Sequence, residues 1–146
     1  MGTLALHREL GHNFTILDTC QAGMKLLGWE VKSLRAGQCK IKDAVAVPTA
    51  HGLSLINLSI TPYAKARAGS MNPARSRALL MSKKEIANLS QQLGQNKSQL
   101  LALKSIYTKG GLIKCELALV EKKRKFDKRR DIRKKEITRR LKRFTR

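Results

Sequence analysis

Residues 100–120 carry the pattern that most restricts the fold of this chain. LLALKSIYT and LIKCELALV flank KGG. Ile113, Cys115, Leu117 and Leu119 occupy alternate positions, and Lys114 and Glu116 lie between the first three. This alternation is typical of a strand with one buried face, and two adjacent glycines are typical of a tight hairpin turn. The sequence therefore predicts an antiparallel hairpin in which the odd positions of the second strand face a core.

Two earlier segments also predict strands. Residues 13–27 are rich in apolar and β-branched residues without a helical stripe, so we expect one bent strand or two joined strands, with a bulge or bend at Gly23. Residues 44–60 predict a hairpin around PTAHG, with a bulge where the apolar parity changes between Leu55 and Ile56. Several short, curved strands favour a small, partly open β-barrel of the oligonucleotide-binding kind.

Two helices are predicted beside these strands. WEVKSLRAG places Val31 and Leu34 three residues apart and ends at Gly37, which is suited to a helix C-terminus. Ser82 and Glu85 have the spacing of a capping box, and the helix they begin is predicted to end at Gly94. We therefore expect a mainly β domain with two or three helices.

Positive charge separates the chain into two predicted parts. Residues 121–146 hold 15 Lys and Arg against four acids, whereas residues 1–120 hold 16 against six, and the net charge is +21. We predict a barrel domain at 1–120 and a basic tail at 121–146. Phosphate backbones are the natural partners of such a charge, with anionic membranes second. No window reaches the roughly 20 apolar residues of a spanning helix, and the start lacks a hydrophobic signal core, so we expect a cytoplasmic protein.

The tail itself has weak helical signals. Glu121, Asp131 and Glu136 each precede a cation by four residues, and such pairs stabilise a helix by only about 0.2–0.5 kcal/mol each. Phe126, Ile137, Leu141 and Phe144 form only a thin apolar stripe. We expect the tail to be largely disordered in the free protein and helical once phosphates neutralise it.

The chain lacks the residue patterns of a catalyst. His7, His12 and His51 are scattered, and the three cysteines have no metal-ligand spacing and are expected to be reduced. We expect no enzyme activity, no metal, no cofactor and a monomer. Six dispersed aromatic residues are too few for base-by-base stacking, so recognition should depend on phosphates and RNA shape. Residues 61–78, with four cations, are predicted to form a mobile basic loop.

Four blocks in order resemble one family. GWEVKSLRAG (28–37), ITPYA (60–64), RSRALLMSKKEI (75–86) and FDKRRDI (126–132) are similar to blocks of the bacterial SsrA-binding protein family, small protein B. The resemblance implies an oligonucleotide-binding-like barrel that binds the tRNA-like domain of transfer-messenger RNA. It also implies entry into the vacant A site of stalled ribosomes for trans-translation, with the tail becoming helical in the empty mRNA channel.

The resemblance implies particular RNA contacts. Gln21 stands where the family usually has Glu, Ser82 stands where it more often has Asn or His, and Leu80 and His12 match its pattern. In the EVKSLRAG block, the alternative to RNA contact is that Glu30 and Lys32 form a solvated helix face. The predicted RNA-binding residues of the barrel are His12, Gln21, Lys32, Ser33, Arg35, Lys40, Arg75, Arg77, Leu80 and Ser82.

The tail matches the family's DKR motif at Asp127, Lys128 and Arg129, whereas Glu121 and Lys122 replace the usual lysine and glycine. Loss of that glycine predicts a stiffer junction. The predicted ribosome- and RNA-binding residues of the tail are Lys123, Arg124, Asp127, Lys128, Arg129, Arg133, Lys134, Arg139 and Arg140. Two alternatives stay open, a general structural ribosomal protein bound to rRNA and a membrane-active cationic protein.

Overall fold

The computed structural model of the chain describes residues 2–63, 72–122 and 132–140. Its labelled strands are β1 (Gly2–Leu6), β2 (Phe14–Met24), β3 (Cys39–Lys40), β4 (Val45–Thr49), β5 (Gly52–Ile56), β6 (Ser59–Ile60), β7 (Arg77–Leu80), β8 (Gln99–Lys109) and β9 (Leu112–Lys122). Its labelled helices are α1 (Leu10–Asn13), α2 (Gly28–Arg35) and α3 (Lys83–Gln95). Residues 132–140 form a further helix.

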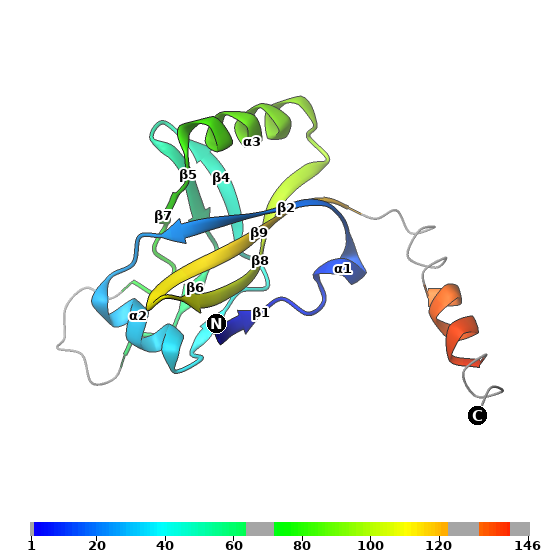
Figure 1. Ribbon diagram of the computed structural model, residues 1–146, viewed down its shortest axis with the longest axis horizontal. Helices are drawn as coiled ribbons and strands as arrows, with labels where there is room; N and C mark the ends of the chain where they lie inside the picture. The colour runs from blue at the N-terminus through cyan, green and yellow to red at the C-terminus, as the bar shows by residue number, and fades with distance from the viewer. Residues whose placement is uncertain (1, 64–71, 123–131, 141–146) are drawn as a thin grey trace.

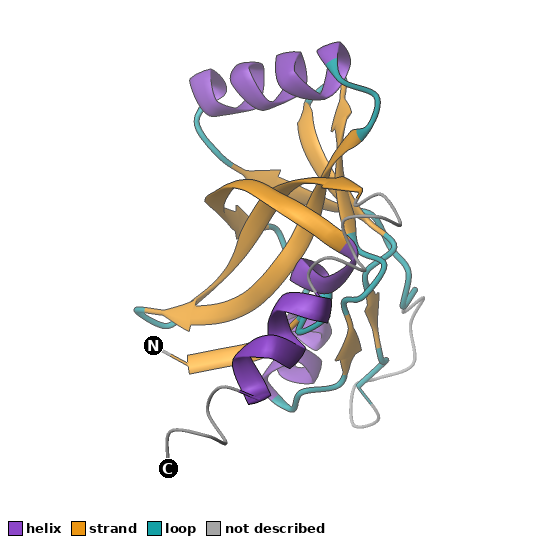
Figure 2. Cartoon of the chain, turned by 90° about the vertical axis from the view of Figure 1, so that its right-hand side faces the viewer, coloured by secondary structure: helices purple, strands orange, loops and turns teal. Residues whose placement is uncertain are grey.

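Six strands close into a barrel. β8, β4, β5, β7, β2 and β9 are hydrogen-bonded neighbours in that order, and β9 pairs back with β8 to complete the ring. β1 lies along the second half of β8, and β3 pairs with β6 in a separate two-stranded ribbon. Figures 1 and 2 show α3 at one end of this ring and α2 at the other. The predicted mainly β barrel with helices is confirmed.

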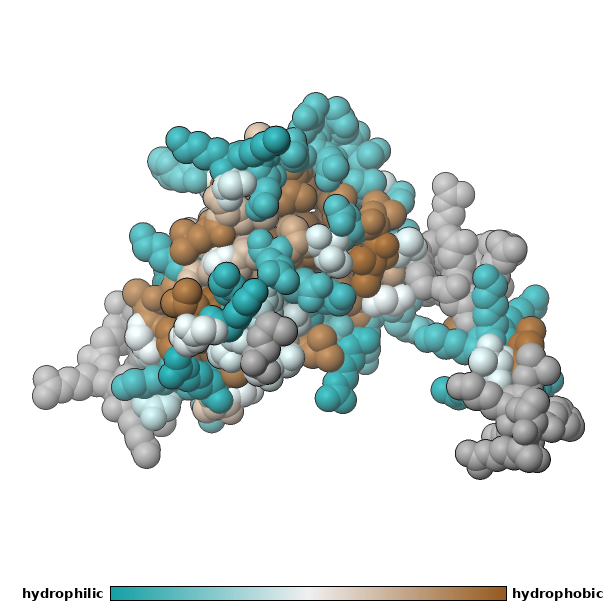
Figure 3. Space-filling model, viewed as in Figure 1, coloured by the Kyte–Doolittle hydropathy of each residue, from teal (hydrophilic) through white to brown (hydrophobic). Residues whose placement is uncertain are grey.

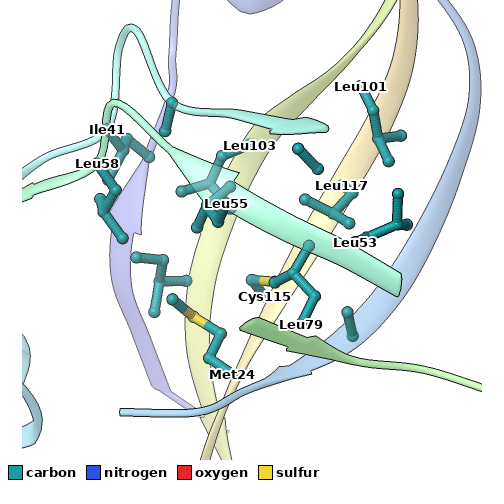
Figure 4. Packing of buried hydrophobic residues seen from close by; sticks show 14 of the residues in the cluster. Met24, Ile41, Leu53, Leu55, Leu58, Leu79, Leu101, Leu103, Cys115 and Leu117 are labelled. Atoms are coloured by element: carbon teal, nitrogen blue, oxygen red, sulfur yellow. The ribbon is translucent and has the colours of Figure 1, made fainter. Parts of the chain in front are cut away.

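The β8–β9 hairpin forms as its alternation predicts. Gly110 and Gly111 make the turn with φ values of 60° and 78°, a conformation that other residues rarely adopt. Ile113, Cys115 and Leu117 face the interior. Figure 4 shows the core that they share with leucines from β5, β7 and β8. On the outer side, Leu10 of α1 covers a smaller apolar cluster with Ala102, Ala118 and Val120.

Neither of the two predicted bulges is found at its predicted position. In β2 the register shifts between Ile16 and Asp18, while Gly23 keeps regular pairing with β9. The β4–β5 hairpin has no bulge. The parity change after Leu55 has another cause, because β5 ends at Ile56. Asn57, with a φ of 61°, then turns the chain so that the side chain of Leu58 is again buried.

The ends of the predicted elements also differ in detail. The first residues form β1 and α1, two elements that the sequence patterns did not predict. Gly37 has the expected left-handed conformation after α2, with a φ of 74°. Ser82 caps α3 by accepting a hydrogen bond from the Glu85 N–H at 3.2 Å, and α3 continues one residue beyond Gly94.

The barrel continues past its predicted boundary at residue 120. Glu121 and Lys122 belong to β9, where Lys122 pairs with Phe14 and Glu121 pairs with Thr15 and Gln99. Glu121 is therefore in a strand and cannot support a tail helix through Lys125. Residues 132–140 form a helix whose residues are all exposed. The expectation that the tail is disordered in the free protein stays a prediction.

A buried ion triad connects α2 to β7. The Glu30 carboxylate is fully buried and accepts hydrogen bonds from Arg75 at 2.6 Å and from Arg77 at 2.5 Å. Its Oε1 also accepts the Leu27 N–H at 2.8 Å. Arg77 is fully buried too and donates to the carbonyls of Leu58 and Pro73. The interpretation of Glu30 as part of a solvated face is wrong, because two arginines neutralise it inside the protein.

Replacing this carboxylate should destabilise the fold in a pH-dependent way. Burial acts to raise the pKa of Glu30, but hydrogen bonds from Arg75, Leu27 and Arg77 outweigh it and lower the pKa below its ordinary value of 4.5. The ionised carboxylate therefore stabilises the fold above that pH, and this contribution is lost as the pH falls through the lowered pKa. Glu30→Gln should lower the free energy of unfolding by about 3–5 kcal/mol at neutral pH.

Urea denaturation of both proteins as a function of pH tests this. The difference in the free energy of unfolding should shrink as the pH falls below about 4. Glu9→Gln is the matched control, because Glu9 pairs with Lys42 at 3.6 Å on the exposed surface, where an ion pair contributes little. A neutral-pH difference as small as that of the control would contradict the role of the triad.

Candidate nucleic-acid interface

Three of the predicted RNA-binding residues lie together on the outer face of the barrel. Gly23 of β2 pairs with Leu80 of β7, and Gln21 lies two residues before Gly23 on the same face. Ser82 follows Leu80 by two residues at the start of α3. Residues far apart in the sequence thus form one surface, which we call the Gln21–Leu80–Ser82 face.

Leu80 is an exposed leucine held over a glycine. Its side chain is 59% exposed. A Cβ added at Gly23 would approach the Leu80 Cβ to 3.2 Å, so the missing side chain of Gly23 makes room for Leu80. Gly23 therefore permits a close approach between strands, where the sequence suggested a bulge.

The surroundings of this face are cationic and partly apolar. Figure 3 shows hydrophobic surface interspersed with hydrophilic side chains across the front of the barrel. Lys25, Lys83 and Lys84 are exposed close to it in the chain, on the β2 end and the first turn of α3. Such a mixture of charge and apolar surface suits a nucleic acid that is contacted through both phosphates and bases.

Other predicted residues of the barrel lie near α2. Lys32, Arg35 and Lys40 are exposed, and the Lys32 ammonium lies 5.6 Å from the centre of the Tyr63 ring. Ser33 is fully buried, and its hydroxyl donates to the Thr61 carbonyl at 2.7 Å. Ser33 therefore supports the chain after β6 and offers no exposed surface to a ligand.

Arg75 and Arg77 belong to the interior triad. Arg77 has no exposed surface, and Arg75 is one-third exposed with a terminal nitrogen bound to Glu30. Because both guanidinium groups are held by the buried carboxylate, direct RNA contact through Arg77 is not supported. Residues 64–71 of the predicted mobile loop at 61–78 lie outside the described residues, whereas Thr61, Arg75 and Arg77 at its two ends are held by hydrogen bonds.

His12 lies at the other end of β2. It is exposed in the last turn of α1, and β2 begins two residues later at Phe14, which pairs with Lys122. Seven strand residues, or about 23 Å, separate Phe14 from Gln21. Figure 1 shows α1 close to the end of β9, so the structure places His12 beside the base of the tail and away from the Gln21–Leu80–Ser82 face.

Part of the tail lies outside the described residues. Lys123, Arg124, Asp127, Lys128 and Arg129 fall there. Arg133, Lys134, Arg139 and Arg140 lie on the helix of residues 132–140, and all four are exposed. That helix presents cations on its surface, as its sequence predicts.

Sequence reasoning missed the residues that support these surfaces. Glu30 and Gly23 gave no signal of burial or close approach, and Tyr63 gave no signal of its contact with Lys32. Glu116 was predicted only to point outward, and it does, beside Gln21. Within the described ranges, no helix is long and apolar enough to span a membrane, and no three potential ligands gather to hold a metal ion.

The barrel, its cationic outer face and its basic tail define a class of small nucleic-acid-binding proteins. The model of the SmpB protein family matches residues 4–146. The SsrA-binding protein of Mycolicibacterium vanbaalenii is 41% identical over 142 residues, covering 94% of this chain and 86% of the relative. That of Thermosipho melanesiensis is 35% identical over 144 residues, covering 99% and 98%.

A solved structure is similar as well. A chain from the work described as "tmRNA-SmpB: a journey to the center of the bacterial ribosome" superposes with a TM-score of 0.69 at 36% identity. The match covers 88% of this chain and 94% of that one. The chain belongs to the SmpB family of SsrA-binding proteins.

Two glycine substitutions should have opposite effects on stability. Gly23→Ala places a methyl group against Leu80 and should lower the free energy of unfolding by about 1–2 kcal/mol, because the neighbour must move. Gly94→Ala meets no atom within 4 Å and should raise it by about 0.5–1 kcal/mol, because alanine favours the helix. Denaturant unfolding measures both changes. Unchanged stability in Gly23→Ala, with unchanged Leu80 methyl chemical shifts, would refute the close approach.

Proposed function

We propose that this chain is an RNA-binding adaptor for trans-translation. It binds the tRNA-like domain of transfer-messenger RNA and delivers this RNA to the vacant A site of stalled ribosomes. It acts in the cytoplasm as a monomer and contributes no catalytic residue. Membership of the SsrA-binding family and similarity to the tmRNA-SmpB structure support the choice of RNA.

The observation that carries the proposal is the Gln21–Leu80–Ser82 face. Three residues from different parts of the sequence, each of which the family resemblance associates with RNA, lie on one outward surface. Leu80 offers an exposed apolar contact for a base or ribose, while the lysines around it attract the phosphates. Shape-dependent binding of folded RNA is the expected mode, because the described strands of the barrel carry no row of stacking aromatic residues.

The tail performs a separate task in this proposal. It leaves the barrel after Lys122, at the end where His12 lies and away from the Gln21–Leu80–Ser82 face. The cations of helix 132–140 would contact rRNA when the mRNA channel is empty. Because Glu121 and Lys122 pair within β9, the tail begins from a fixed strand where the family usually has a flexible glycine.

A general structural protein of the ribosome is the second candidate, favoured only by the net charge of +21. Copurification separates the two functions. A structural protein would be present at near one copy in all ribosomes, whereas an adaptor would be enriched with transfer-messenger RNA. A membrane-active protein is the least supported candidate, because the nine residues of helix 132–140 include only two large apolar side chains, Ile132 and Ile137.

Removing the tail should separate RNA binding from tagging. A chain ending at Lys122 keeps every strand pair of β9, so its affinity for transfer-messenger RNA should stay within about threefold of the wild type, while peptide tagging on stalled ribosomes should be lost. Filter binding and an in vitro tagging assay measure the two properties.

A full-length variant separates the effect of the tail's charge on tagging from the effect of its helix. Ile137→Pro keeps all tail charges but breaks helix 132–140, since an interior proline costs about 3 kcal/mol or more. Tagging should fall in this variant as well. Normal tagging by the truncated chain would refute the division of labour between barrel and tail.

A further inference from the structure

A small pocket opens on the outer face of the barrel beside Gln21. It has a volume of about 220 Å³ and is lined by Gly2, Thr3, Gln21, Ser105, Tyr107 and Glu116. The strand pairing fixes this arrangement, because Glu116 of β9 pairs with Gln21 on one side and with Ser105 on the other. With about 30 Å³ per water molecule, the pocket has room for about seven waters, which suits one planar ring system and excludes a duplex.

The Glu116 carboxylate has only weak partners among the described residues. The Lys104 ammonium and the Ser105 hydroxyl each lie 3.5 Å from a Glu116 oxygen, beyond the usual range of a good hydrogen bond. Lys104 and Glu116 are each about one-third exposed, and ion pairs at such sites contribute little to stability. Glu116 therefore retains most of its capacity to accept hydrogen bonds from a ligand.

The pocket floor contains a second group that lacks a partner. Tyr107 is 9% exposed, and its buried hydroxyl makes no hydrogen bond within the part of the chain that the structure describes. A buried hydroxyl without a partner costs free energy, so natural proteins rarely retain one without a reason. A ligand that enters the pocket beside Glu116 would bring hydrogen-bonding groups to this floor.

The charge of Glu116 restricts what this ligand can be. An ionised carboxylate only accepts hydrogen bonds and repels phosphate, so the groups of an RNA that suit it are the N–H or O–H donors of a base or ribose. An unpaired guanine carries two adjacent donors, N1–H and the N2 amine, which match the two oxygens of one carboxylate. Its neighbouring O6 is an acceptor for the Gln21 amide, which donates where a glutamate could not.

We propose that this pocket binds one unpaired guanine of the RNA, through Glu116 and Gln21 above the floor formed by Tyr107. The inference rests on the proposed function, because it places a base-specific contact beside the Gln21–Leu80–Ser82 face. Phosphate contacts position the RNA, and the guanine contact makes the complex depend on sequence. Glu116 and Tyr107 thereby become specificity residues.

Chemical probing of the full-length protein with transfer-messenger RNA tests the site. Kethoxal modifies N1 and N2 of unpaired guanines, while hydroxyl radicals cleave the backbone wherever it is exposed. The wild type should protect one unpaired guanine from kethoxal within its backbone footprint. Glu116→Gln should restore modification of that guanine and lower the affinity about tenfold, as expected for loss of a bidentate base contact.

Two further variants test whether guanine protection depends specifically on Glu116 and on the Tyr107 hydroxyl. Glu121→Gln is the matched control, since it makes the same change of charge at the far end of β9 and should keep the protection. Tyr107→Phe removes the hydroxyl without a partner, so it should not lower the free energy of unfolding, yet it should weaken protection of the same guanine.

The outcomes separate this site from the proposed function. An intact backbone footprint with equal guanine protection in wild type and Glu116→Gln overturns the guanine site and leaves the RNA-binding function standing. Protection of a cytosine or adenine in place of guanine, detected with dimethyl sulfate, also overturns it. No footprint from the wild type would contradict the proposed function together with the site.

Discussion

The Glu30 carboxylate between Arg75 and Arg77 is the interaction on which the arrangement of the barrel depends. One charged group from α2 and two from the segment entering β7 meet in the interior, where removal of one partner leaves a buried charge. Arg77 is also the first residue of β7, so the triad fixes where that strand starts. Leu80, three residues later, is thereby positioned over Gly23.

This constraint explains how a short strand can present a binding surface. β7 has four residues and joins β5 and β2 through only two residue pairs each. Such limited pairing holds a strand weakly, and the ion triad supplies the further anchoring. The other end of the barrel differs, because the long strands β2, β8 and β9 are paired over most of their length and β9 continues to Lys122. The proposed RNA-contacting face and the attachment of the tail thus depend on separate structural supports.

Periodicity and turn chemistry made part of the fold predictable from the sequence. The alternation in residues 112–120, the double glycine of the turn and the Ser82 cap are local signals, and the structure confirms them. Long-range pairing gave no such signal. Glu30 resembled a surface residue because its partners are 45 and 47 residues away, and Gly23 resembled a bulge because Leu80 comes from another strand. The family resemblance marked Gln21, Leu80 and Ser82, but only the barrel brings them together.

A photo-crosslinking amino acid at position 80 tests the central claim most directly, that this face of the barrel contacts transfer-messenger RNA. The same group at position 112 is the control, because Leu112 is equally exposed but lies at the tip of the β8–β9 hairpin. After irradiation in cells, the RNA crosslinked at position 80 should be transfer-messenger RNA, enriched well above position 112. Ribosomal RNA at position 80, or equal amounts of transfer-messenger RNA at both positions, would contradict the account.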